Sequence, residues 1–295
     1  MMDGVLVVRK EKGYTSHDVV AKLRGILHMK KIGHTGTLDP DAEGVLPVVL
    51  GKATKLAELL TDKEKTYETV LRLGIETDTE DMTGTVLKEL PVTVSEEEVR
   101  AAASRFLGRQ QQIPPMYSAV KVNGKKLYQL AREGVTVERK PRTVYFREIR
   151  ILDMALPEVK LSISCSKGTY IRTLCHDIGR YLGCGGCMKE LLRTRSGQFT
   201  LEESLTLEEI REYAEKGCLE EHIRSIEEVL GDYPAVFCRE EADRLLLNGN
   251  ALKEEDVSGL EKEGWMRMHT SAGRFIGVYQ WDPESRSCRP VKMFL

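Results

Sequence analysis

Apolar residues recur at two spacings along the chain, and these spacings predict its helices and strands. Helical spacing is found in 16–27, 53–60, 95–107 and 169–182, and the stretch 205–230 is acidic and helical in character. Ser95 followed by Glu98 predicts a capping box at the start of 95–107. Alternating positions predict strands over 5–8, 67–73, 161–165, 265–270 and 275–281. Between them, 33–47 is dense in Gly, Thr and Asp and is predicted to be a loop, and 74–84 a polar turn.

A basic segment stands out from this pattern between residues 115 and 150. It holds nine basic and three acidic residues, although the whole chain has a net charge of −2, and 202–263 carries nineteen acidic and seven basic residues. Asn123-Gly124 predicts a tight hairpin within the segment. We expect a lobe outside the core with a face suited to a polyanion, although a solvated surface explains any single charged stretch equally well.

The length of 295 residues suggests two domains, and the change of character after Gly231 places a boundary near residue 232, with a small, mostly β module behind it. Seven cysteines without a regular framework indicate reduced thiols. No stretch has the length and apolar character of a membrane span or of a signal peptide, so a cytoplasmic location is expected.

The strongest local feature is the loop Gly33–Pro47. Pro40 disfavours a helical conformation at Asp39, so this carboxylate is presented rather than placed in a helix, where it can act as a nucleophile or a general base. An ordinary Asp-Pro turn explains the same residues.

Two further side chains have a chemical interpretation. Tyr67 lies near a strand end, where its ring could stack on a base, and Arg172 falls in the first turn of a helix, where the macrodipole disfavours a cation. A carboxylate partner would offset that cost, and Asp39 as this partner would have its pKa lowered. Core packing of Tyr67 and a solvated Arg172 are the alternatives.

Other site classes find little support. Gly51-Lys52-Ala53-Thr54 lacks the glycine and hydroxyl positions of a phosphate loop, and 78–84 lacks the frame of a calcium loop. Cys184 and Cys187 lack a second well-separated pair of zinc ligands. These residues therefore favour neither a phosphate-binding loop nor a calcium or zinc site.

Five segments, in this order, resemble the bacterial TruB-type tRNA pseudouridine synthases: Gly33–Pro47, Lys65–Tyr67, Pro114–Lys121, Gly124–Tyr128 and Cys165–Leu174. The resemblance implies an α+β fold. Its catalytic domain, 1–231, would have a mixed, largely antiparallel sheet and a thumb insertion at about 115–150. Residues 232–295 resemble, less sharply, a PUA-type RNA-binding module.

By this resemblance the chain isomerises uridine 55 in the T loop of tRNA to pseudouridine by flipping the base, breaking the C1′–N1 bond and forming a C5–C1′ bond, without a metal or an organic cofactor. Asp39 is the catalytic carboxylate, acting on C1′, on the base or on the 2′ proton. Tyr67 stacks on the base and helps remove its C5 proton, and Arg172 pairs with Asp39.

The remaining roles implied by the resemblance concern substrate binding. His34 fills space left by extruded bases, Tyr170 hydrogen-bonds in the pocket and Leu191 packs on the uracil. The basic lobe closes on the T arm and contacts phosphates by charge, with Lys121, Lys125 and Lys126 among its cations.

Two other functions fit the same residues. The chain could be a tRNA-folding chaperone that flips and releases bases without chemistry, or the catalytic subunit of a guide-RNA-directed complex. Against the second stand the lack of long basic tails and the presence of the thumb-like segment. We expect a monomer that acts on the T arm of tRNA with no obligatory protein partner and no membrane contact.

Overall fold

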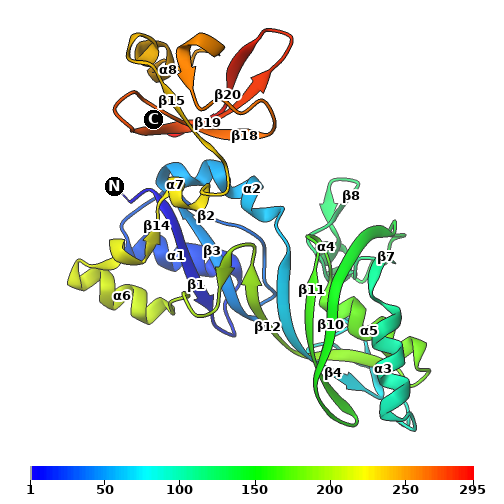
Figure 1. The fold of residues 1–295 in the computed structure, drawn as a ribbon. Helices are drawn as coiled ribbons and strands as arrows, with labels where there is room; N and C mark the ends of the chain where they lie inside the picture. Colours follow the sequence, from blue (N-terminus) through cyan, green and yellow to red (C-terminus); the bar gives the residue numbers. More distant parts are fainter. Residues whose placement is uncertain (1) are drawn as a thin grey trace.

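The computed structural model describes residues 2–295, which form two large sheets in succession along the chain (Figure 1). Residues up to β14 (Ile223–Arg224) build a ten-stranded sheet, and residues from β15 (Ala235–Cys238) onward build a six-stranded one. The change of sheet falls around the boundary near residue 232 that the sequence suggests. No helix among residues 2–295 has both the length and the apolar character needed to cross a bilayer.

The ten-stranded sheet has the order β14-β1-β3-β12-β4-β11-β10-β7, with β2 paired to β3 and β13 to β12. Only the β12–β3 pair is parallel among the described strands of this sheet, so the expected mixed, largely antiparallel α+β architecture is confirmed. Its other strands are β1 (Gly4–Lys10), β2 (Ile32–His34), β3 (Glu43–Leu50), β4 (Lys65–Leu73), β7 (Gly108–Gln112), β10 (Arg142–Ala155), β11 (Glu158–Cys165), β12 (Gly186–Ser196) and β13 (Phe199–Thr200).

Helices and two small hairpins surround this sheet. Ser95 caps α3 in the predicted capping box with Glu98, and Asn123 and Gly124 adopt the positive φ angles of a tight turn between β8 and β9. The helices around this sheet are α1 (Ser16–Ile26), α2 (Ala57–Thr61), α3 (Glu96–Arg105), α4 (Leu127–Arg132), α5 (Ile171–Tyr181), α6 (Leu207–Lys216) and α7 (Ile226–Val229), and the hairpins are β5 (Ile75–Thr77) with β6 (Val86–Glu89) and β8 (Lys121–Val122) with β9 (Lys125–Lys126). Helix α8 (Asp243–Leu247) instead packs with the six-stranded sheet, whose core contains Leu246.

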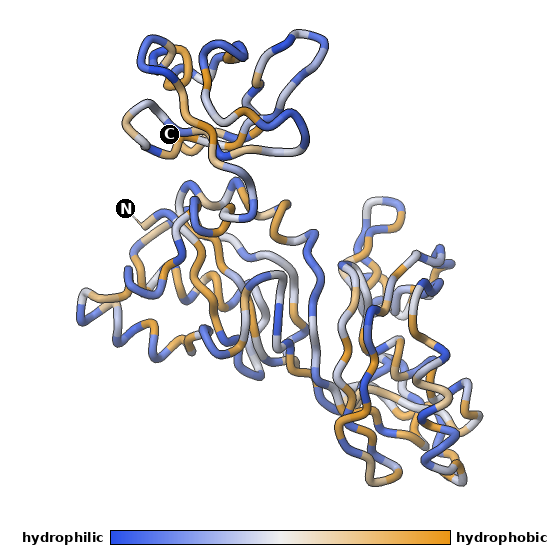
Figure 2. The backbone as a smooth tube through the Cα atoms, viewed as in Figure 1, coloured by the Kyte–Doolittle hydropathy of each residue, from blue (hydrophilic) through white to orange (hydrophobic). Residues whose placement is uncertain are grey.

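The six-stranded sheet lies at one end of the unit built on the larger sheet, next to α2 and α7 (Figure 1). Its order is β16-β20-β19-β18-β15-β17, with β16 (Leu252–Lys253), β17 (Val257–Ser258), β18 (Trp265–His269), β19 (Phe275–Asp282) and β20 (Ser287–Met293). Val278 and Phe294 share one buried apolar cluster with Val5, Val49 and Phe199 of the first sheet. The apolar tube segments of Figure 2 accordingly include strands of both sheets.

The prediction of a continuous loop over 33–47 is wrong at both ends. β2 includes Gly33 and His34, and β3 begins at Glu43, which leaves 35–42 as the connecting loop. Every residue of β3 from Gly44 onward is buried, so its sequence is a continuous apolar run without the alternation that marks a half-exposed strand.

The prediction that all of 115–150 lies outside the core is also wrong. Residues 142–150 belong to β10, which pairs with both β7 and β11, and Val144 and Phe146 are buried in the main core. Exposed Arg142, Arg147 and Arg150 lie before and after these buried positions and hide the strand pattern. The lobe is therefore limited to the region before β10, where the β8–β9 hairpin projects from the sheet (Figure 1).

The acidic stretch 205–230 is helical only in part. It contains α6 and α7, but strand β14 lies between them and pairs with β1. Similarly, β5 occupies 75–77 within the predicted polar turn, and 53–60 is divided between a 3₁₀ turn, Gly51–Leu56, and α2. Short elements of this kind carry too few residues to show a period.

Candidate active site

Asp39 lies in the loop between β2 and β3. Its backbone carbonyl accepts a hydrogen bond from Ala42 N at 3.1 Å, and the next carbonyl, that of Pro40, accepts from Gly13 N at 3.0 Å. The Asp39 side chain is 41% exposed. The loop is thus fixed by its backbone while its carboxylate faces outward.

Arg172 binds this carboxylate from α5. Its Nε lies 3.1 Å from Asp39 Oδ2, so the ion pair expected from the sequence is present. Arg172 is the second residue of the helix and only 6% of its side chain is exposed. The carboxylate offsets the unfavourable macrodipole at this helix end.

A second carboxylate, Asp81, shares the same guanidinium. Arg172 Nη1 lies 3.4 Å from Asp81 Oδ2, and Asp81 Oδ1 accepts hydrogen bonds from Thr79 Oγ1 at 2.7 Å and from Thr83 Oγ1 at 2.6 Å. The acidic turn dismissed as a calcium loop therefore holds an anchor for Arg172. Sequence reasoning missed it because 39 and 81 are distant in the chain.

The pKa of Asp39 differs from the sequence expectation. Burial raises it above its ordinary value, and the Arg172 charge opposes this rise without reversing it. The predicted lowering is therefore wrong in net direction, although Arg172 acts in the predicted sense. The second carboxylate, Asp81, contributes to the rise because like charges disfavour ionisation.

Tyr67 and Leu191 form an apolar wall behind the loop. Both are buried, in one cluster with Leu38 and Ala42, which flank Asp39 on either side. Burial raises the pKa of the Tyr67 phenol, and the Asp39 charge adds to this rise. The structure therefore brings Asp39, Tyr67 and Arg172 together, and Leu191 lies in the same apolar cluster as Tyr67.

Tyr170 precedes Arg172 at the start of α5 and lies in the same electrostatic environment. Burial raises the pKa of its phenol, with further effects from the Arg172 and Asp39 charges. Its backbone N–H donates to Gln112 Oε1 at 2.8 Å, which joins the helix start to β7.

His34 closes β2 next to the loop. Burial lowers the pKa of its imidazole, aided by the Arg193 charge, and its buried Nδ1 has no hydrogen-bond partner among residues 2–295. The neutral form of the His34 ring is therefore favoured.

The three lysines of the basic lobe do not join this cluster. Lys121 lies on β8, and Lys125 and Lys126 lie on β9 across the hairpin. Lys125 pairs with Glu133 at 3.5 Å, and Lys126 lies over the Tyr128 ring. The lobe reaches the site through its base instead, where Arg172 Nη2 donates to the Tyr117 carbonyl at 2.9 Å.

Lys10 is a functional candidate that sequence reasoning missed. Its side chain is fully buried, and Nζ donates to the carbonyls of Pro40 at 3.0 Å, Ala42 at 2.6 Å and Glu11 at 3.0 Å. Burial lowers the pKa of this lysine to about 8. Lys10 therefore supports the backbone directly after Asp39, and nothing in the pattern of β1 distinguishes it from a surface lysine.

Arg193 is the second missed residue. It is fully buried on β12 and pairs across the sheet with Tyr67. Its Nε donates to the Val45 carbonyl at 2.7 Å and its Nη2 to the Gly36 carbonyl at 3.2 Å. Strand β12 also carries Lys189 and Arg195, so the sequence alone gives no reason to place Arg193 in the interior.

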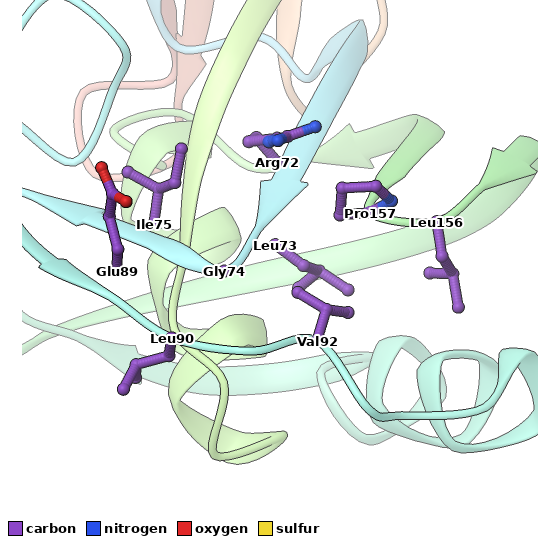
Figure 3. A pocket seen from close by; sticks show the side chains of 9 residues that line it. All are labelled: Arg72, Leu73, Gly74, Ile75, Glu89, Leu90, Val92, Leu156 and Pro157. Atoms are coloured by element: carbon purple, nitrogen blue, oxygen red, sulfur yellow. The ribbon is translucent and has the colours of Figure 1, made fainter.

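A hollow elsewhere in the molecule is separate from this site. Its volume is about 500 Å³, and it lies where β4 ends against β6 and the β10–β11 turn, with Leu73, Leu90 and Leu156 in its wall (Figure 3). None of the residues discussed above lines it.

Comparison with known proteins places this geometry in a family. The model of the TruB family pseudouridylate synthase N-terminal domain matches residues 24–171, and that of the tRNA pseudouridylate synthase B C-terminal domain matches residues 172–231.

Full-length relatives and a solved structure agree with these matches. The tRNA pseudouridine synthase B of Lachnoclostridium phytofermentans is 52% identical over 100% of both chains, and that of Bacillus pumilus is 44% identical over 99% of this chain and 98% of the relative. A chain of an H/ACA ribonucleoprotein bound to a substrate RNA containing 2′-deoxyuridine superimposes with a TM-score of 0.74 at 26% identity, covering 99% of this chain and 85% of that chain. This chain therefore belongs to the TruB family of pseudouridylate synthases.

Proposed function

We propose that this protein converts uridine 55 in the T loop of tRNA to pseudouridine, with Asp39 as the catalytic carboxylate. The observation that carries the proposal is the ion pair of Asp39 with buried Arg172, beside Tyr67 and Leu191. The relatives named tRNA pseudouridine synthase B support tRNA as the substrate.

The first requirement of the reaction is access to the uracil. A stacked base must leave its helix or loop, at a cost of a few kcal/mol, and must be held by stacking and hydrogen bonds in the enzyme. The ring of Tyr67 and the side chain of Leu191 form an apolar wall beside Asp39 that suits a flipped uracil. His34 occupies the space that the flipped base leaves in the T loop. The hydroxyl group of Tyr170 hydrogen-bonds to the flipped base.

The second requirement is an ionised carboxylate. Whether Asp39 attacks C1′, attacks the base or removes the 2′ proton, each route needs a lone pair on its oxygen. Arg172 favours that form, although burial raises the pKa of Asp39. After the C1′–N1 bond breaks and the C5–C1′ bond forms, Tyr67 accepts the C5 proton.

We further propose that residues 1–231 are the catalytic domain, with the β8–β9 lobe as a thumb, and that 232–295 is a PUA-like RNA-binding domain. Lys121, Lys125 and Lys126 are exposed or half-buried cations on the thumb, positioned to contact T-arm phosphates. The protein acts as a monomer without an obligatory protein partner.

The test separates chemistry from binding. Unmodified tRNA is incubated with wild type, Asp39→Asn or the control Asp41→Asn, whose exposed side chain lies two residues away. Pseudouridine is measured by mass spectrometry and tRNA binding by filter retention. We expect loss of product with retained binding for Asp39→Asn only.

Two substrates complete the test. A tRNA with cytidine at position 55 should give no product, and an isolated T-arm stem-loop should be modified by the purified chain alone. Full modification by Asp39→Asn would overturn the role of Asp39, and wild type that refolds tRNA without forming pseudouridine would favour the chaperone.

A further inference from the structure

Arg193 lies where three strands of the site meet. In register, it is the cross-strand partner of Tyr67 on β4 and of Gly44 on β3. Directly opposed residues of an antiparallel pair point to the same face of the sheet. The Arg193 side chain is therefore directed to the face that carries the Tyr67 phenol.

The guanidinium also holds both flanks of the Asp39 loop. It donates to the carbonyl of Gly36, three residues before Asp39, and to that of Val45, six residues after it. The approach is close, since a Cβ atom added to Gly36 would lie 3.7 Å from Arg193 Nη1. One side chain thus connects the loop of the proposed carboxylate with the strand of the proposed base.

Its positive charge is met by dipoles. The groups that interact with it are the two carbonyls and the Tyr67 phenol, and no carboxylate is among the groups that shift its proton affinity. Although burial lowers the pKa of Arg193, a guanidinium stays protonated in proteins. Burying a cation without a carboxylate partner costs free energy of desolvation. A charge kept at this cost is expected to serve the site.

We propose that Arg193 is a positioning residue for pseudouridine formation: it fixes the Asp39 loop against β4 and supplies the charge that favours the phenolate of Tyr67. This rests on the proposed function of Tyr67 as the base. The phenolate oxygen takes the proton from C5, and the electrons of the broken C5–H bond restore the C5–C6 double bond of the uracil. The electron pair of the C6–N1 double bond returns to N1, which takes a proton from solvent.

The two arginines then have separate tasks. Arg172 favours the ionised carboxylate of Asp39, and Arg193 favours the ionised phenol of Tyr67, whose pKa burial would otherwise raise unopposed. Each of the two buried acids thus lies beside its own cation, while the Asp39 charge still adds to the rise in the Tyr67 pKa.

The experiment measures single-turnover pseudouridine formation by Arg193→Gln from neutral to alkaline pH, with tRNA affinity measured separately. We expect a loss of roughly 100-fold at neutral pH with little change in affinity, and a rate that rises more steeply with pH than that of wild type. The control is Arg195→Gln, an exposed arginine on the same strand.

Replacement of Tyr67 by 3-fluorotyrosine gives a readout that a merely structural role would not change. Because fluorination makes the phenol more acidic, it should restore much of the lost rate in Arg193→Gln and bring the pH profile back toward neutrality. A wild-type rate and profile in Arg193→Gln would overturn the proposal, as would a loss that is independent of pH and unaffected by fluorination.

If Arg193→Gln does not fold, Arg193→Lys decides, since its shorter side chain cannot reach both loop carbonyls and the phenol. For Arg193→Lys we expect the rate of pseudouridine formation to fall about 10-fold and to recover when Tyr67 is replaced by 3-fluorotyrosine. A wild-type rate and pH profile in Arg193→Lys would overturn the proposal. Failure here is distinguishable from failure of the proposed function, because the latter is judged by Asp39→Asn and by product at position 55.

Discussion

Ser16 and Leu38 exchange two hydrogen bonds across the base of the site. The amide of Leu38 donates to Ser16 Oγ at 2.9 Å, and the Ser16 hydroxyl donates to the Leu38 carbonyl at 3.3 Å. Both residues are buried, and Leu38 directly precedes Asp39. The start of α1 therefore fixes the backbone that presents the carboxylate.

Ser16→Ala should consequently impair catalysis more than binding. It leaves the buried amide of Leu38 without its partner, which costs about 1–3 kcal/mol of stability, and it frees the loop before Asp39. We expect kcat to fall roughly 10-fold or more with little change in KM for tRNA. The control Ser104→Ala, on the exposed face of α3, should leave both unchanged. An unaltered kcat in a destabilised Ser16→Ala would show that the loop does not depend on this contact.

Removal of the Arg172 charge should displace the acid limb of activity. Asp39 must be ionised, and its pKa is already raised by burial, so activity is lost on acidification at a pH above the ordinary Asp range. Without Arg172 the pKa rises further, and the acid limb of single-turnover rates for Arg172→Met should move to higher pH. The matched control is Arg180→Met, on the exposed part of the same helix. An acid limb that stays in place would argue against the ion pair as the source of ionisation.

Buried Lys10 should make stability rise in alkaline solution. Its pKa is about 8 in the folded chain against an ordinary value of 10.5, so within this window the unfolded chain binds more protons and the free energy of unfolding increases with pH. One lysine contributes at most about 3 kcal/mol in this way. Urea unfolding across the window should show a smaller increase for Lys10→Met than for wild type or for Lys12→Met, whose side chain is exposed. An equal increase in the free energy of unfolding of wild type, Lys10→Met and Lys12→Met would contradict the lowered pKa of Lys10.

Neutralisation of the thumb lysines should change the salt dependence of binding. If Lys121, Lys125 and Lys126 each contact a phosphate, their joint replacement by alanine should reduce the slope of log Kd against log salt by about 2–3. The rate of pseudouridine formation in tRNA that is already bound should change little. Replacement of three exposed lysines elsewhere in 1–231, Lys88, Lys160 and Lys216, is the control. A slope equal to that of wild type would place the phosphate contacts on other residues.

The sequence predicted features that depend on local chemistry. The alternation of β4 predicted the inward face of Tyr67, because one side of that strand is buried and the other is half-exposed. The capping box at Ser95 and the turn at Asn123-Gly124 were likewise visible, since backbone geometry restricts which residues fit there. The pairing of Asp39 with Arg172 was predicted because a cation in the first turn of a helix is unfavourable without a carboxylate partner.

Features that depend on long-range packing were not predictable. Lys10, Asp81 and Arg193 each act through partners far away in the chain, so neither spacing nor composition separates them from surface charges. Strand β3 was missed because it is buried on both faces, and the net direction of the Asp39 pKa shift depends on how deeply the folded chain buries the loop. Tertiary structure alone provides this information.

The apolar cluster shared by the two sheets has a consequence for truncation. Val278 and Phe294 pack in one cluster with Val5 of β1 and Val49 of β3, the strand that follows the Asp39 loop. Lys292 Nζ also donates to the Lys55 carbonyl at 2.8 Å. A fragment ending at residue 231 would expose this apolar surface to water and become prone to self-association. The C-terminal module is thus part of the stable unit and not a detachable appendage.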